Sequence, residues 1–409
     1  MARYDAYDDR PRRSGCVGCL TCICLVAALV AATVVFAFRA GIPVEAVAHA
    51  IGHRALGKVG FSVPEEDSSR KDSLGYSGAQ LPEVQQDVYL QILEGLERLD
   101  ETVVVLEAAP TDIDPAYRAI MRDHPELFWL DGSCSYTYAT IGGFVTVEPG
   151  TLVPTDQVAS IREQIEAAAD SFLQSLPADA DDYAIARAAY EYVITNTDYA
   201  LDASYNQSIM SVFLGHSSVC AGYARAYQYL LQRAGVMCAY VEGSILDTGE
   251  EHAWNLVRIG GAYAYVDPTW GDPTYSGDTE NLMSTNIIYD YLCLTTDEIQ
   301  RDRHAFADAS AWPTCDSGEL DYYRREGLMF DSYDQSILSQ AFWQQEQTGQ
   351  RYAAFKFATD ADYSAARDQL AAGTFLYDDL VTLATNAEDD TLRYGYTTSD
   401  TLRILKLYW

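Results

Sequence analysis

The chain has 409 residues, of which 48% are hydrophobic and 21% are charged, and its formal net charge is −33 at pH 7. This composition excludes a disordered chain and is sufficient for two or three folded domains. Because so acidic a surface repels phosphate backbones and anionic lipid faces, we expect no nucleic acid among its partners.

Residues 17–38 form an apolar segment without charge, bounded by Arg12 and Arg13 on one side and by Arg39 on the other. The segment is long enough for the roughly 20 residues of a membrane-spanning helix, whereas the apolar run of a secretory signal has only about 7 to 15. We therefore expect a retained anchor, although the sequence AHA at 48–50 is a candidate cleavage site. A slight excess of Arg before the span predicts that residues 1–16 are a cytoplasmic tail and that the body is extracytoplasmic.

A linker and a small mixed domain are predicted after the apolar segment. The second half of residues 39–83 is polar and rich in Ser and Gly, which indicates a linker. Residues 84–150 predict an α+β extension with helices over 84–100 and 115–123. Turn signals separate its short strands, which we expect at 127–130, 135–140 and 143–147.

Residues 151–317 form the largest predicted domain. Its third helix begins around Cys220 and stops at Gly235, a typical residue after a helix end. The predicted helices are 155–176, 181–196 and 219–234. An irregular stretch, 197–218, leads into the last of them. Runs rich in β-branched and aromatic residues predict strands at 236–242, 252–259, 262–266 and 286–295.

A hairpin signal, Gly260-Gly261, joins the second and third of these strands. His252 begins one strand of this hairpin and Asp267 ends the other, so antiparallel pairing should bring the two side chains together. The helix that carries Cys220 then needs only to pack on the sheet for all three groups to meet.

The remaining residues, 318–409, predict a small α+β accessory domain. We expect helices at 335–346 and 361–370 and strands at 351–358 and 402–409.

A thiol, an imidazole and a carboxylate in this order predict a cysteine nucleophile. Cys220 at a helix N-terminus is favoured as a thiolate, His252 can take its proton, and Asp267 can orient the imidazole. Gly222 leaves space for close approach to the thiol. Backbone N–H groups at the start of the helix are candidate oxyanion donors, and the side chain of Tyr199 is another.

The strings CAGYARAYQYLLQRAGV, HAWNLV and AYAYVDPTWGD resemble the core of the transglutaminase-like superfamily, papain-like cysteine enzymes with a Cys-His-Asp triad. The resemblance covers about residues 180–272. It implies an α+β fold in which a helix bearing the nucleophile Cys220 packs on an antiparallel sheet bearing the base His252 and the orienting Asp267. The flanking positions that it implies shape the site are Trp254, Asn255 and Trp270. The calcium-binding insertions and β-sandwich domains of animal transglutaminases are not visible, so we expect no metal and no cofactor.

Two single-residue alternatives stay open at this point. His216 competes with His252 for the role of base because it lies close to Cys220 in sequence, and Asp272 competes with Asp267 for the role of orienting acid.

The nine cysteines fall into two groups. The first group lies in or beside the apolar segment: Cys16, Cys19, Cys22 and Cys24. The second lies in the body: Cys134, Cys220, Cys238, Cys293 and Cys315. With Cys220 as nucleophile, the other four of this group are able to form two disulfides in an oxidising exterior, and their pairing stays open.

Together these features predict a membrane-anchored, extracytoplasmic cysteine enzyme that acts on an amide bond of a protein or peptide substrate. Water as acceptor would make it a peptidase or amidase, which we favour, and an amine would make it a transglutaminase. The alternative from another class is a catalytically silent binding or adhesion module on the same fold. A zinc peptidase is disfavoured because the sequence has no HExxH spacing.

Overall fold

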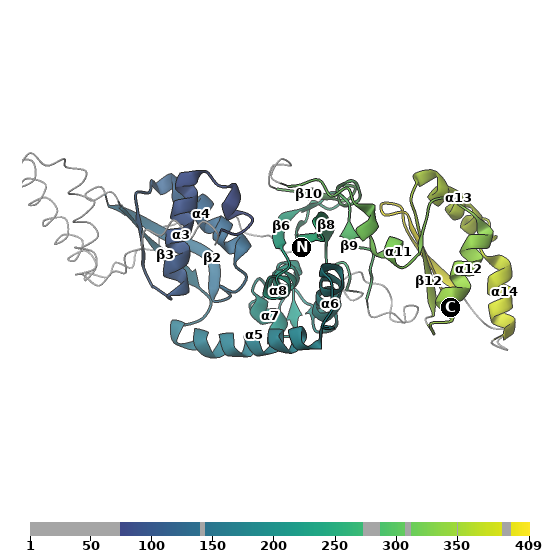
Figure 1. The fold of residues 1–409 in the computed structure, drawn as a ribbon, viewed down its shortest axis with the longest axis horizontal. Helices are drawn as coiled ribbons and strands as arrows, with labels where there is room; N and C mark the ends of the chain where they lie inside the picture. The colour runs from purple at the N-terminus through teal and green to yellow at the C-terminus, as the bar shows by residue number, and fades with distance from the viewer. Residues whose placement is uncertain (1–73, 140–143, 273–286, 307–311, 350, 387–393) are drawn as a thin grey trace, which may run out of the picture. The chain divides into compact units, whose positions relative to one another are not determined.

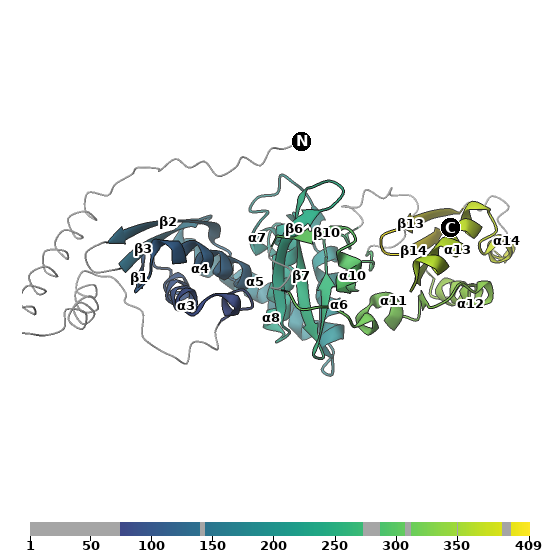
Figure 2. The same ribbon diagram turned by 90° about the horizontal axis from the view of Figure 1, so that it is seen from above.

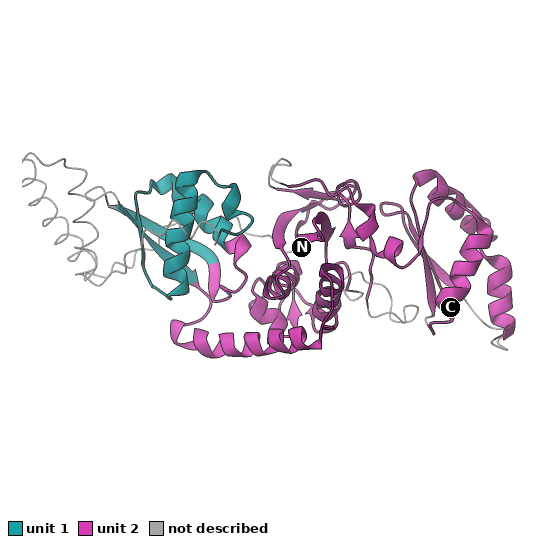
Figure 3. Ribbon diagram, viewed as in Figure 1, with its two compact units in different colours: residues 1–120, 132–150 teal, residues 121–131, 151–409 magenta. Residues whose placement is uncertain are grey.

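A computed structural model describes most of the chain after the predicted linker. The described ranges are 74–139, 144–272, 287–306, 312–349, 351–386 and 394–409. The predicted tail, the predicted membrane span and most of the predicted linker lie outside them. No helix in these ranges combines the length and the apolar character needed to cross a bilayer. The chain divides into two compact units, residues 1–120 with 132–150 and residues 121–131 with 151–409 (Figure 3).

The first unit is a small α+β structure. Its three-stranded sheet has the order β1-β3-β2, and β1 pairs antiparallel with β3 through Val103 and Val147. Helix α3 packs on β1, and Gly95 lies so close that an added Cβ would be 2.5 Å from Val103. The elements are α3 (Glu83–Glu97), β1 (Val103–Leu106), α4 (Pro110–Asp123), β2 (Leu130–Ala139) and β3 (Phe144–Thr151), preceded by the 3-10 turn Gly78–Gln80.

One prediction in this region is wrong, and one strand was missed. The run 127–130 is a turn up to Leu130, because the backbone N–H of Leu127 bonds to the carbonyl of His124 and that of Leu130 bonds back to Leu127. Its aromatic side chains are buried without belonging to a strand. Strand β1, a short apolar run of β-branched residues, was not predicted.

The second unit is built on a five-stranded antiparallel sheet with the order β10-β6-β7-β8-β9. The predicted hairpin is present as β7 and β8, and Gly260 and Gly261 in its turn have φ of 55° and 93°. Such values favour glycine because it has no Cβ. The strands are β6 (Cys238–Ile245), β7 (Glu251–Ile259), β8 (Ala262–Val266), β9 (Leu292–Leu294) and β10 (Arg303–Ala305).

Helices of the second unit lie beside this sheet (Figure 1). The three predicted helices are confirmed to within one residue, and Asp181 caps the second by accepting from the N–H of Ala184 at 2.8 Å. Helix α8 packs on β6 and β7 (Figure 2). Asn255 of β7 donates from Nδ2 to the carbonyl of Ala224 in α8 at 3.0 Å. The helices are α5 (Thr155–Ser175), α6 (Asp182–Thr195), α7 (Ile209–Phe213), α8 (Cys220–Arg233) and α10 (Thr296–Ile299). Short strands β4 (Asp198–Tyr199) and β5 (Ser217–Ser218) pair in the loop before α8.

The strand predicted over 286–295 is much shorter in the structure, where only Leu292–Leu294 form β9 among its described residues. The preceding residues are held by contacts outside the sheet. Tyr190 donates its hydroxyl to the carbonyl of Ile288 at 2.6 Å, and the N–H of Ile288 bonds to Gly271. Strand β10 and helix α7 were not predicted.

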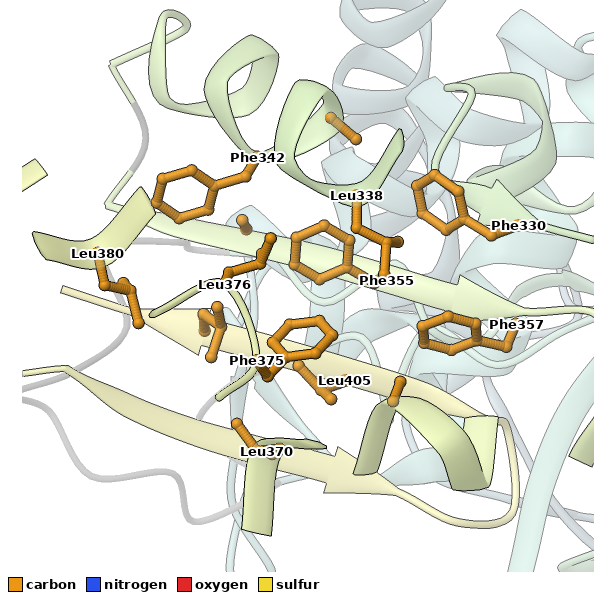
Figure 4. Packing of buried hydrophobic residues seen from close by; sticks show 14 of the residues in the cluster. Phe330, Leu338, Phe342, Phe355, Phe357, Leu370, Phe375, Leu376, Leu380 and Leu405 are labelled. Atoms are coloured by element: carbon orange, nitrogen blue, oxygen red, sulfur yellow. The ribbon is translucent and has the colours of Figure 1, made fainter. Parts of the chain in front are cut away.

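The C-terminal part of the second unit forms a four-stranded sheet with the order β11-β12-β14-β13. One sheet face carries Phe355, Phe357 and Leu405, which pack against Leu338 and Phe342 of α12 (Figure 4). All predicted elements here are present within about two residues. The elements are α11 (Tyr322–Arg325), β11 (Met329–Phe330), α12 (Gln335–Glu346), β12 (Tyr352–Phe357), α13 (Asp360–Ala371), α14 (Tyr377–Asn386), β13 (Gly395–Ser399) and β14 (Ile404–Tyr408).

The opposite face of this sheet carries two buried lysines. Lys356 on β12 bonds to Asp321 at 2.5 Å and to Glu298 at 2.7 Å, and Lys406 on β14 bonds to Asp290 at 2.8 Å. These carboxylates belong to residues before the C-terminal sheet, so buried ion pairs tie that sheet to the preceding segment. The predicted domain boundary near residue 317 stays a prediction.

Candidate active site

Cys220 is the first residue of α8. The residue before it, Val219, has extended backbone angles and makes no side-chain hydrogen bond to the helix end. The first N–H groups of a helix have no partner within it, and the positive end of the helix dipole favours an anion there. Cys220 is half-buried, so its thiol combines a favourable position for a thiolate with access from outside.

The loop before α8 is fastened directly against the first turn of the helix. Ser218 donates its hydroxyl to the carbonyl of Asn206 at 3.0 Å, and its oxygen lies 2.6 Å from that of Ser211. A Cβ added to Gly222 would be 1.9 Å from the Ser218 hydroxyl. The space that the sequence predicted at Gly222 is therefore filled by this loop, which fixes the backbone around Cys220.

The sheet brings His252 and Asp267 together as predicted. His252 lies near the start of β7, opposite Gly243 of β6, and Asp267 directly follows β8. The imidazole Nε2 is 2.7 Å from Oδ2 of Asp267, and the two residues are 5% and 0% exposed. Since Asp267 engages Nε2, Nδ1 is the ring nitrogen that remains for the thiol.

Cys220 reaches the imidazole from the helix side. It packs against a buried cluster of Ala221, Ala224, Tyr240 and Ala253, and Ala253 is the neighbour of His252 in β7. Burial alone would lower the pKa of His252, but the charge and hydrogen bond of Asp267, followed by the hydrogen bond and charge of Cys220, outweigh it and raise the pKa to about 9. The arrangement therefore favours a protonated imidazole beside the thiol.

Asp267 is a buried carboxylate whose two oxygens are both engaged. Oδ1 accepts from the backbone N–H groups of Thr269 at 3.1 Å and Trp270 at 3.3 Å. Oδ2 accepts from His252 and from Arg303. Burial by itself would raise the pKa of Asp267, but the nearby charges of His252 and Arg303 hold that pKa below its usual range.

Arg303 is a site residue that sequence reasoning missed. It is 2% exposed and donates to Oδ2 of Asp267 from Nε at 3.1 Å and from Nη2 at 2.7 Å. It lies 36 positions after Asp267, on a strand of three residues. No local pattern marks such an arginine, so the sequence carried no signal that could have found it.

The flanking residues implied by the resemblance surround these groups. The ring of Trp254 lies 6.1 Å from the imidazole of His252 in a stacked orientation. Trp270 lies beside Tyr291, with ring centres 5.2 Å apart, and under the guanidinium of Arg303. Asn255 contacts α8 as described above, so it positions the helix.

The two alternative residues are engaged elsewhere. Asp272 is buried and accepts a hydrogen bond from the Tyr223 hydroxyl at 2.6 Å, while Asp267 bonds to His252. The Nδ1 of His216 lies 3.0 Å from the carbonyl of Asn196. The geometry therefore favours His252 and Asp267 as the partners of Cys220.

All five cysteines of the described ranges are free thiols, so the disulfides considered from the sequence are not formed. Three of them are buried: Cys238, Cys293 and Cys315. Across those same ranges, acidic, thiol and imidazole side chains nowhere gather in a group able to hold a metal ion.

Comparison with known proteins gives the class to which this region belongs. Residues 170–268 match the family model of the transglutaminase-like superfamily, and the range contains Cys220, His252 and Asp267. The chain carries a transglutaminase-like domain with an α+β fold.

Individual relatives are distant. The chain is 26% identical over 141 residues to the kyphoscoliosis peptidase of Mus musculus. This alignment covers 31% of this chain and 21% of the mouse protein. It thus spans about a fifth of the length of that relative. A transglutaminase crystal structure is similar over 34% of this chain and 44% of its own, with 13% identity and a TM-score of 0.25. The periplasmic domain of TgpA from Pseudomonas aeruginosa is similar over 31% and 54%, with 19% identity and a TM-score of 0.21.

Proposed function

We propose that this protein is a cysteine enzyme that breaks an amide bond of a protein or peptide through an acyl-thioenzyme, with Cys220 as nucleophile, His252 as base and Asp267 as orienting acid. One observation carries the proposal. The buried hydrogen bond of 2.7 Å between His252 and Asp267 leaves the other ring nitrogen for a half-buried thiol at the start of α8. A binding scaffold has no need of these three groups together.

The reaction follows from the positions of these groups. His252 takes the proton of the Cys220 thiol, and the thiolate forms a bond to the carbonyl carbon of the substrate. The first N–H groups of α8, which a helix leaves without an internal partner, are proposed to stabilise the negative charge that develops on the carbonyl oxygen. When the carbon–nitrogen bond breaks, the imidazolium gives its proton to the leaving amine or ammonia, and the acyl group stays on sulfur as a thioester.

The thioester is then released to an acceptor. We propose water, activated by the neutral imidazole, which makes the enzyme a peptidase or amidase. A primary amine as acceptor would make it a transglutaminase, because the first half-reaction is the same. The charge-free segment 17–38 supports a further part of the proposal, that the protein is anchored in the cell membrane with this domain outside the cytoplasm.

The acceptor is tested by mass spectrometry of the full chain with glutamine-containing peptides, each with and without a primary amine. Hydrolysis predicts cleaved or deamidated peptide in both conditions, and Cys220→Ala should abolish it. Incorporation of the amine without cleavage would overturn the preference for water. Retention of the chain in membranes after an alkaline wash tests the anchor, and release would contradict it.

The nucleophile is tested without knowledge of the substrate. Iodoacetamide at neutral pH should alkylate Cys220 much faster than Cys134, which is also half-buried and in no disulfide and so serves as the internal reference. A catalytically silent binding module would be favoured instead if the two thiols are alkylated at equal rates and Cys220→Ala binds a partner as well as the wild type does.

A further inference from the structure

Arg303 contacts the proposed active site from a distant part of the sheet. It lies on β10, an edge strand, whereas Asp267 follows β8, and strands β6 and β7 stand between them in the sheet order. Its side chain is fully buried, and both members of the pair are inaccessible to water. An arginine with no exposed surface is costly unless its charge is matched, so its location is determined by its partners.

Two positively charged groups share a single oxygen of Asp267. His252 Nε2 and Arg303 Nη2 each lie 2.7 Å from Oδ2, and Arg303 Nε lies 3.1 Å from it. Backbone N–H groups occupy the other oxygen. The carboxylate therefore cannot rotate toward or away from the imidazole without losing bonds to Arg303.

Arg303 is itself held rigidly. Its Nη1 donates to Asp302 at 2.6 Å, and Asp302 also accepts from the hydroxyl of Tyr291 at 2.6 Å. The guanidinium lies over the rings of Trp270 and Tyr291, 4.7 Å and 4.5 Å from their centres. Stacking of this kind suits the planar guanidinium and not the ammonium of lysine. The guanidinium that binds Asp267 is thus held in place by three neighbouring side chains: Asp302, Trp270 and Tyr291.

We propose that Arg303 is a positioning residue that fixes the Asp267 carboxylate and, through its own charge, limits how firmly that carboxylate holds the proton on His252. This inference rests on the proposed function of the site. The groups that act on the imidazole are Asp267 after β8 and Cys220 on α8, and Arg303 on β10 acts through the shared oxygen. Glu251 precedes His252 in β7 but is exposed.

The consequence concerns the second proton transfer of the reaction. The imidazolium must give its proton to the leaving amine, and a carboxylate with no other cation would hold that proton more tightly. Arg303 disfavours a second positive charge on the same oxygen. It keeps His252 a strong enough acid to release the proton, while Asp267 keeps it a strong enough base to take the proton from Cys220.

The test is a pH titration of the full chain labelled with 13C at the histidine Cε1, with the His252 signal assigned by its loss in His252→Gln. The chain has six histidines, so the signals are few. Arg303→Gln should raise the pKa of His252 by roughly one unit, because a like charge at this range has been removed. A folded Arg303→Gln with an unchanged or lowered pKa would overturn the proposal.

Two further variants separate charge from position. Arg301→Gln removes a cation two residues away whose partners, Asp360 and the carbonyl of Thr401, belong to the C-terminal part, so the pKa of His252 should not move. Arg303→Lys keeps the positive charge but loses the two-point hydrogen bonding of the guanidinium to Asp267. We therefore expect a smaller rise in the pKa of His252 than in Arg303→Gln, and a fall of about tenfold in the rate of Cys220 alkylation. An Arg303→Lys variant that equals the wild type in both would overturn the proposal even where Arg303→Gln does not fold.

Alkylation of the wild-type protein keeps this inference distinct from the proposed function. A wild-type Cys220 that reacts no faster than Cys134 would refute the nucleophile itself. If Cys220 of the wild type reacts fast and the Arg303 variants leave both its alkylation rate and the pKa of His252 unchanged, only the role of Arg303 is refuted.

Discussion

The titration of His252 should make the stability of the protein depend on pH. Its pKa is about 9 in the folded protein against 6.5 for an exposed histidine, so the folded state binds this proton more tightly. The stabilisation is therefore fully present below about pH 6.5 and is lost as the pH rises through about 9. At about 1.4 kcal/mol per pKa unit, the difference corresponds to about 3 kcal/mol.

The assay is urea unfolding of wild-type protein and His252→Gln at steps between pH 6 and about pH 10. Tyrosines and lysines titrate in both proteins, so the difference between their free energies of unfolding isolates the histidine. We expect this difference to change by about 3 kcal/mol in favour of the variant as the pH rises. Two curves that stay parallel over the whole range would refute the reasoning, because they would show that the imidazole is not held in its charged form.

Three other expectations concern stability and thiol access. Gly222→Ala should destabilise the protein by about 1 to 3 kcal/mol in urea unfolding, since the new Cβ collides with Ser218, and equal stability would contradict the close packing of the loop. Lys356→Met should cost about 3 to 5 kcal/mol because it removes the lysine that pairs with the buried carboxylate of Asp321 and the closest cation of Glu298, which keeps Arg403 at 3.6 Å. Adding the neutral Asp321→Asn and Glu298→Gln should recover most of that loss, and no recovery would mean that the charges are not the cause. The buried thiols should resist a disulfide reagent in the native protein and react only on unfolding, because burial raises the pKa of each: Cys238, Cys293 and Cys315.

Local sequence determined the helices and the hairpin because their causes lie within a few residues of each element. Helix α6 has its cap at Asp181, and the β7–β8 turn has two glycines with positive φ. The hairpin register then follows, and it is this register that places His252 beside Asp267. These features could be predicted since backbone conformation and hydrogen bonding along adjacent residues decide them.

Tertiary structure decided what separate segments do to one another. The strand predicted around Tyr289 became a loop because Tyr190 and Gly271 bind its backbone. The choice of Asp267 over Asp272 depended on Tyr223, which reaches Asp272 from α8. In each case the sequence offered a reasonable local pattern, and contacts from elsewhere in the fold decided the outcome.

By itself, then, the sequence predicted which residues could perform the proposed chemistry and that Cys220, His252 and Asp267 should meet. It could not determine that a fourth side chain, Arg303, shares the carboxylate, because two strands, β6 and β7, lie between β10 and β8 in the sheet. The physical reason is the separation along the chain over which each kind of interaction acts. Periodicity, caps and turns act between neighbours in the chain, whereas the match of a buried charge to its partner is made between strands that only the folded sheet brings together.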